Sequence, residues 1–162
     1  MTLAASHALP WIDSAADADR LRDPSMGRAA ALLLLRDNDR FALSVSRKTS
    51  GLIGLPSGKL DPGETPLAGC LREVEEETGL RIAPEIASWL GAAICEPEHE
   101  GGRFFWVDAF VVRWNGSMGE PRQMEPQVLP AWVAPDELVS RGAFAAYNAA
   151  VLRAWRAKHQ KA

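Results

Sequence analysis

Hydrophobic and polar residues follow two different periods along this chain, and these periods predict where its strands and helices lie. Residues 28–36 contain an unbroken apolar run over 29–35, which predicts a strand buried on both faces. Residues 41–47 predict a second strand. Asp37, Asn38 and Asp39 lie between them and have side chains that suit a tight turn, so we expect a hairpin.

The second half of the chain predicts three more strands and a helical end. Strands over 86–95 and 103–114 are expected to pair across a polar loop, and a shorter strand follows over 127–133. Pro135 opens helical segments that continue through Glu137 and then over 144–158. The pattern indicates an α/β chain with a single main domain over 28–162.

The first 27 residues are expected to form an N-terminal extension. Residues 10–22 predict a short amphipathic helix in which Trp11, Ala15 and Leu21 are available for packing. Asp23 and Pro24 end this helix.

Residues 65–79 carry the clearest helical signal in the chain. Thr65 is suited to cap the first turn, Pro66 to take the first helical position and Gly79 to end the helix. At about 100° per residue, one face holds Leu67, Leu71, Val74 and Thr78. Nearly opposite lie Glu73, Glu76 and Glu77, and we expect these three acids to point away from the core together.

This group of acids predicts a metal site. Glutamates three or four positions apart on a helix repel by roughly 0.2–0.5 kcal/mol per pair unless a cation lies among them. Mg²⁺ is suited to the position because it is a hard ion that prefers carboxylate oxygens. Arg72 is expected to orient a carboxylate by pairing with Glu76 or with Glu64. Gly58 lets the backbone approach an ion and offers its carbonyl oxygen as a ligand. The alternative is a charged helix face that is merely solvated.

The segment over 58–80 reads GKLDPGETPLAGCLREVEEETGL. It resembles the Nudix box, G-x5-E-x7-R-E-U-x-E-E-x-G-U with U apolar, at every defined position. The resemblance implies a Nudix-type α/β/α sandwich with a mixed central sheet over 28–162. It also implies hydrolysis of a nucleoside diphosphate linked to another group, with Mg²⁺ or Mn²⁺. By matching position, the metal ligands are Gly58, Glu73, Glu76 and Glu77, and the orienting partners are Arg72 and Glu64.

A second stretch, EPRQMEPQVLPAWVAPDEL over 120–138, is similar to a segment of Nudix proteins that hydrolyse nucleoside triphosphates. The similarity implies that Glu125 is an additional metal ligand or the catalytic base. The alternative is an exposed loop acid, and the rivals for the role are Glu96, Glu98, Glu100, Glu120 and Asp108. The expected catalytic residues are thus Glu76, Glu73, Arg72 and Glu125, and the identity of the base stays open.

Contacts to a nucleotide are predicted from aromatic and basic residues near the box. The candidates for stacking on a base are Phe104, Phe105, Trp106 and Trp132. Strand alternation places Phe104 and Trp106 on one face and Phe105 on the other, so only one set can face the pocket. Lys59 and Arg47 are candidates for phosphate contacts, with simple surface solvation as the rival interpretation.

Composition narrows the function classes. The chain has 162 residues and a net charge of −3, which argues against nucleic-acid binding and favours a small nucleotide as partner. Its two cysteines form no disulfide framework, and the sequence shows neither a secretory signal nor a membrane-spanning apolar run. We therefore expect a cytoplasmic enzyme, and a homodimer is left open.

Substrate choice follows from the resemblance. The markers for NADH and coenzyme A hydrolysis are absent, so canonical or oxidised nucleoside triphosphates lead, cleaved to a nucleoside monophosphate and pyrophosphate. ADP-ribose or a nucleotide sugar is the alternative. A Nudix domain that binds or senses nucleotides without hydrolysing them is the alternative from another class.

Overall fold

The computed structural model describes residues 10–97 and 101–160, and its centre is a mixed seven-stranded sheet. The strands are β1 (Gly27–Arg36), β2 (Phe41–Arg47), β3 (Ile53–Gly54), β4 (Ser57–Lys59), β5 (Ser88–Cys95), β6 (Phe105–Arg113) and β7 (Val128–Val133). The helices are α1 (Ala15–Leu21), α2 (Pro66–Thr78), α3 (Glu137–Ser140) and α4 (Ala145–Gln160). The 3₁₀ turn η2 (Pro84–Ile86) lies between α2 and β5, and the 3₁₀ turn η3 (Gly116–Met118) lies between β6 and β7.

Strand β1 organises the sheet because it changes partners along its length. One edge pairs in parallel with β6 from Gly27 to Leu35. On the other edge, Ala29–Ala31 pair with β4, whereas Leu35 and Arg36 pair with β2. Strand β2 then continues the sheet with β3 and β7. The sheet therefore divides beside β1, with β4 on one side of the division and the β2–β7 ribbon on the other.

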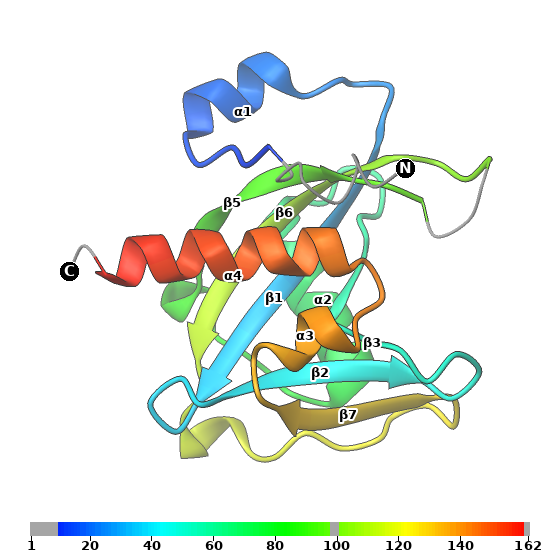
Figure 1. Ribbon diagram of the computed structural model, residues 1–162, viewed down its shortest axis with the longest axis vertical. Coiled ribbons are helices and arrows are strands. Elements are labelled where there is room, and N and C mark those ends of the chain that lie inside the picture. The colour runs from blue at the N-terminus through cyan, green and yellow to red at the C-terminus, as the bar shows by residue number, and fades with distance from the viewer. Residues whose placement is uncertain (1–9, 98–100, 161–162) are drawn as a thin grey trace.

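Two cores form on the two faces of this sheet. On one face, Leu33 and Leu35 of β1 belong to a buried cluster with Leu138 of α3 and Val151 of α4. On the other face, Leu32 and Leu34 belong to a cluster with Cys70 and Val74 of α2. Figure 1 shows α4 crossing the near face of the sheet while α2 lies behind it. The predicted α/β/α sandwich and the doubly buried strand are confirmed.

The predicted hairpin between β1 and β2 is also confirmed. Asp37, Asn38 and Asp39 adopt left-handed φ values of 54°, 54° and 65°. Asn and Asp tolerate this region better than most other residues. The expected pairing of the later strands is confirmed too, since β5 and β6 are antiparallel from Ser88 to Cys95. Strand β5 begins two residues later than predicted because η2 occupies Pro84–Ile86.

The N-terminal segment packs differently from the prediction. Helix α1 begins only at Ala15 and buries none of its residues, and Leu21 is 49% exposed. The contact with the domain comes earlier, from extended backbone: the Ile12 N–H donates to the Ala92 carbonyl at 2.9 Å and the Ala92 N–H donates back at 2.8 Å. The predicted packing of Leu21 is therefore wrong, whereas Trp11 does pack against the core. The division into an extension and a separate domain stays a prediction.

Among residues 10–97 and 101–160, no helix combines the length and the apolar character needed to span a membrane.

Candidate metal-dependent active site

Helix α2 begins and ends where its sequence predicts, and this sets the register of its acids. The Thr65 hydroxyl accepts a hydrogen bond from the Ala68 N–H at 3.2 Å, and Pro66 takes the first helical position. Gly79 ends the helix in the left-handed conformation, with φ of 76°. Its N–H donates to the Glu75 carbonyl at 2.9 Å. These local signals fix which glutamates face the sheet and which face solvent.

Arg72 connects three carboxylates of the box. Its Nε and Nη2 donate to the two oxygens of Glu64 at 2.8 and 3.0 Å, a two-pronged arrangement. Its Nη1 donates to Glu73 Oε1 at 3.0 Å and to Glu76 Oε1 at 3.2 Å. Its Nη2 also donates to the Lys59 carbonyl at 3.0 Å, which ties α2 to β4. The structure thus forms both of the pairings that the sequence left as alternatives.

Glu64 is held in its ionised form by these contacts. The Arg72 side chain is the main reason that its pKa falls to about 2, and the Asp61 N–H, which donates at 2.8 Å, acts in the same direction. The ionised Glu64 in turn holds the Arg72 guanidinium in place through two hydrogen bonds.

Gly58 is in direct contact with Glu73. A Cβ built on Gly58 would overlap the Cδ, Cγ and Oε1 atoms of Glu73, so no other residue fits there without movement. The glycine therefore allows β4 and the Glu73 carboxylate to approach each other closely. Its role as a backbone ligand stays a prediction. Burial is the main cause of a raised Glu73 pKa, with the contact to Arg72 opposing it.

Glu77 differs from the prediction that all three helix acids point away from the protein. It is only 9% exposed, because α2 lies against β4 and the Ser57 N–H donates to Glu77 Oε1 at 3.0 Å. Burial raises the pKa of Glu77 to about 7, and the charges of Glu73 and Glu125 add to the rise. The Ser57 hydrogen bond and the Arg47 charge oppose it. Only Glu76, whose side chain is 53% exposed, points into solvent as expected.

The charges of Glu125 and Arg47 both act on Glu77, the first raising its pKa and the second lowering it. Two rivals of Glu125 are engaged elsewhere. Asp108 is buried and accepts from Arg28 at 3.2 Å and from the Trp89 indole at 2.9 Å. Glu120 pairs with Arg36 at 2.9 Å. Glu98 and Glu100 lie outside the described residues, and Glu96 is exposed after β5.

The predicted nucleotide contacts have mixed outcomes. Trp106 is 1% exposed, so it cannot stack on a bound base, and that prediction is corrected. Its strand is covered by packing on both faces, which the sequence alone did not reveal. Phe104 precedes β6 and is 50% exposed, so its role stays a prediction. The Lys59 ammonium lies 5.4 Å from the centre of the ring of Phe105, another of the aromatic candidates.

Comparison with known proteins agrees with this geometry. The model of the NUDIX domain matches residues 26–155. The chain belongs to the Nudix family. A MutT-like protein of Streptomyces ambofaciens is 32% identical over 113 residues, which cover 70% of this chain and 67% of that relative. The predicted family is confirmed, and with it the class of enzyme, a Nudix hydrolase.

Solved Nudix structures share the fold. The MutT NUDIX hydrolase of Burkholderia pseudomallei is 26% identical and gives a TM-score of 0.65 over 79% of this chain and 97% of that one. The NUDIX domain of Shewanella oneidensis NrtR, solved with ADP ribose, gives a TM-score of 0.63 at 17% identity, over 90% of this chain and 98% of that one. At that identity the second likeness shows the fold alone.

Nudix hydrolases generally use a divalent metal, and the residues of this site fit one. Within the part of the chain that the structure describes, no three acidic, histidine or cysteine side chains already surround one point. Nevertheless, Glu77 is buried and Glu73 is partly buried, so both offer carboxylate oxygens with little access to water, and Gly58 lies against the Glu73 carboxyl. Burial disfavours the ionised form of both carboxylates, and the charge of Glu73 adds to this effect at Glu77. A nearby hard cation would stabilise the ionised forms.

Proposed function

We propose that this Nudix domain is a Mg²⁺-dependent pyrophosphohydrolase that cleaves a nucleoside triphosphate to a nucleoside monophosphate and pyrophosphate. The observation that supports it best is the arrangement of acids around Arg72. One guanidinium holds Glu64, Glu73 and Glu76, while Glu77 is buried and accepts a hydrogen bond from the Ser57 N–H. The proposed ligands of Mg²⁺, or of Mn²⁺ in its place, are the Gly58 carbonyl and the carboxylates of Glu73, Glu76 and Glu77.

The reaction adds one water across a phosphoric anhydride. The water oxygen forms a bond to phosphorus, the bond from phosphorus to the leaving phosphate oxygen breaks, and a carboxylate takes the water's proton. Bound metal supplies positive charge beside the anhydride and lowers the pKa of a coordinated water. Arg72 keeps the carboxylates oriented, and Glu76 and Glu125 are the candidate bases.

Contacts to the substrate come from residues around the box. We assign phosphate contacts to Lys59, which is in the box, and to Arg47, whose charge lowers the pKa of Glu77. Exposed Phe104 is assigned to the base. Cytoplasmic location, absence of nucleic-acid binding and homodimer formation remain predictions from the sequence.

The choice of a triphosphate rests on the similarity of residues 120–138 to a segment of Nudix proteins that hydrolyse nucleoside triphosphates. The relative from Streptomyces ambofaciens is described as MutT-like, and the Burkholderia pseudomallei structure as a MutT hydrolase. The bound ADP ribose of the NrtR domain keeps ADP-ribose, or a nucleotide sugar, as the second candidate. Nucleotide binding without hydrolysis is disfavoured because every acid of the box is present.

A substrate panel tests the proposal. Phosphate release, coupled to pyrophosphatase or to phosphatase, is measured with Mg²⁺ on canonical and oxidised triphosphates, ADP-ribose, nucleotide sugars and dinucleoside polyphosphates. We expect pyrophosphate from a triphosphate. Turnover confined to ADP-ribose or a nucleotide sugar would replace the substrate, and absence of all turnover would favour a binding role.

A further inference from the structure

The connection from β6 to β7, residues 114–127, is a long segment with little regular structure, yet it carries Glu125. A surface connection of this length is ordinarily mobile. In this protein, hydrogen bonds hold the C-terminal part of the segment, residues 122–126, in place. The Arg122 N–H donates to the Thr78 carbonyl at the end of α2, at 2.9 Å. The Gln123 side-chain amide donates to the carbonyls of Glu125 and Pro126 at 3.1 and 3.0 Å. The turn that bears Glu125 is therefore held against α2.

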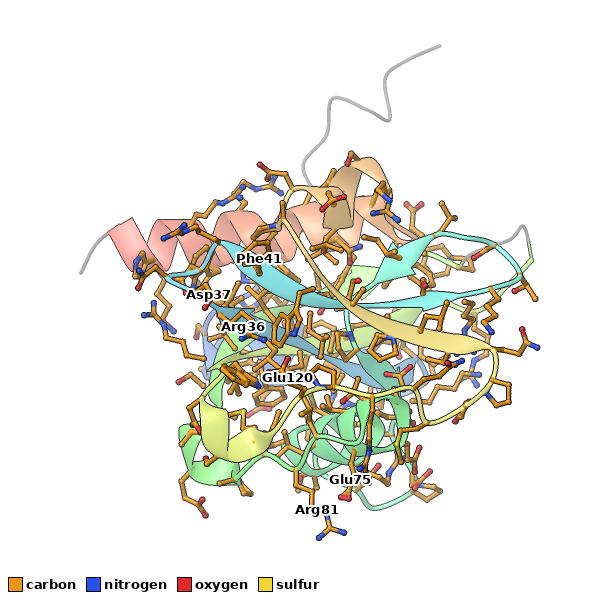
Figure 2. All side chains as sticks on the ribbon, turned by 90° about the horizontal axis from the view of Figure 1, so that it is seen from below. Arg36, Asp37, Phe41, Glu75, Arg81 and Glu120 are labelled. Carbon is orange, nitrogen blue, oxygen red and sulfur yellow. The ribbon has the colours of Figure 1, made fainter. Side chains whose placement is uncertain are left out.

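Arg36, the last residue of β1, contacts the N-terminal part of the same segment, at Trp114 and Glu120. Its guanidinium carbon lies 4.0 Å from the ring centre of Trp114, where the segment begins. Its Nη1 donates to both Glu120 oxygens at 2.9 and 3.2 Å, within the segment. The same guanidinium carbon lies 4.8 Å from the ring centre of Trp132 in β7, the strand that follows the segment. Figure 2 shows Arg36 next to Glu120 at the end of β1.

These contacts restrict Arg36 itself. Its side chain is only 20% exposed and lies close to two indole rings, which contact one another edge to face at 6.3 Å. A planar guanidinium suits this position, since it can stack on an aromatic face and donate to a carboxylate at the same time. A further bond, from the Trp114 indole to the Gly119 carbonyl at 2.8 Å, closes the turn that precedes Glu120.

We propose that Arg36 is a positioning residue for Glu125: its contacts with Trp114, Glu120 and Trp132 hold segment 114–127 so that Glu125 lies beside the carboxylates of α2. The inference rests on the proposed function, because it assigns Glu125 to that reaction. Arg36 has no contact with the box acids among the interactions described above, so its influence has to pass through the segment.

A double-mutant cycle tests this inference. Arg36→Gln is expected to lower kcat on the order of 10-fold while KM changes less than about twofold, because a misplaced group slows the chemical step more than binding. In a Glu125→Gln background, the same change is expected to cost less than about twofold, since the group it positions is already gone. Arg36→Lys keeps the charge and should recover part of the rate.

The control is Arg156→Gln, which breaks another surface ion pair of 2.9 Å, with Asp136, at α4 on the other face of the sheet. It should leave kcat unchanged. Amide hydrogen exchange over 119–126 should accelerate in Arg36→Gln while exchange in α2 does not. If Arg36→Gln fails to fold, Glu120→Gln removes only the ion pair and should show the same non-additivity.

Three outcomes would overturn the inference, and a fourth would overturn the proposed function on which it rests. An equal loss of kcat in both backgrounds would mean that Arg36 acts independently of Glu125. A Glu125→Gln enzyme with full activity would leave nothing to position. A wild-type chain that turns over no nucleotide would fail the proposed function first. Turnover that depends on Glu76 but is insensitive to Arg36 would reject the inference alone.

Discussion

Arg72 is the residue on which the orientation of the box carboxylates depends. It contacts Glu64, Glu73 and Glu76 and also the backbone of β4 at Lys59. Because Glu64 is charged and engaged on both oxygens, the guanidinium has little freedom to rotate. Arginine rather than lysine is required by this geometry, since an ammonium group cannot make two parallel bonds and still reach two further carboxylates.

We predict that Arg72→Lys lowers kcat by about 10- to 100-fold, because the carboxylates lose their common partner. The pKa of Glu64, about 2 in the wild type, should rise toward its ordinary value of 4.5. Carboxyl chemical shifts followed through a pH titration measure the second effect. An unchanged Glu64 pKa together with wild-type turnover would show that Arg72 does not orient the site.

Glu77 makes the stability of the metal-free protein depend on pH. Its pKa is about 7 in the folded chain and near 4.5 when unfolded, so the folded state keeps a proton that the unfolded state releases. The stabilising contribution is complete below pH 4.5 and is lost as the pH rises through 7. We predict that Tm in EDTA falls as the pH rises from 5 to 8, and that the free energy of unfolding falls by roughly 2 kcal/mol over this range.

The matched variant is Glu77→Gln, whose Tm should fall less over the same range because it has no proton to lose there. Mg²⁺ should raise the wild-type Tm more at pH 8 than at pH 5, since it binds the ionised acid. A wild-type Tm that rises with pH in EDTA would be incompatible with a buried Glu77 of raised pKa.

At the scale of elements, the site depends on the contact between β4 and α2. The helix itself was predictable because its signals are local: Thr65 and Gly79 mark its ends. The hairpin at Asp37–Asp39 and the buried strand β1 were predictable for the same reason. The burial of Glu77 and of Trp106 was not, since it depends on which distant segments cover each element.

Gly58→Ala tests the contact between these elements. A methyl group there overlaps the Glu73 carboxyl, so we predict a loss of about 1–3 kcal/mol in stability and weaker metal binding. Gly54→Ala in β3 is the control, because a Cβ at Gly54 meets nothing within 4 Å. Chemical denaturation measures the stability of the two variants, and Mg²⁺ titration measures their metal binding. Equal effects of the two substitutions would argue against close packing of Glu73 on Gly58.

On the scale of the whole molecule, residues far apart in the chain complete the fold. Trp11 lies 6.0 Å from the ring of Tyr147 in α4 and in close contact with Gly91 in β5. The backbone of Ile12 forms two hydrogen bonds with Ala92 and covers the middle of this edge strand. The sequence marked Trp11 as available for packing but placed it in a helix, because its apolar spacing does not reveal its partner.

We predict that Trp11→Ala destabilises the protein by about 2 kcal/mol while leaving kcat unchanged, since the contact is remote from Arg72 and Glu77. Leu21→Ala, at a position 49% exposed, should change stability by less than about 0.5 kcal/mol. Denaturant unfolding and steady-state turnover distinguish the two effects. A Trp11→Ala enzyme with wild-type stability would mean that the N-terminal segment is not part of the folded unit.

The most direct test of the central claim is Mg²⁺-dependent pyrophosphate release from a nucleoside triphosphate by wild type, Glu76→Gln and Glu75→Gln. The two substitutions are adjacent on α2, but Glu76 contacts Arg72 whereas Glu75 pairs with Arg81 outside the site. We predict that Glu76→Gln lowers kcat by at least about 100-fold and that Glu75→Gln keeps wild-type turnover. EDTA should abolish the turnover of wild type and of Glu75→Gln. Equal activity of the two variants, or turnover that persists in EDTA, would contradict a metal-dependent site built on the box acids.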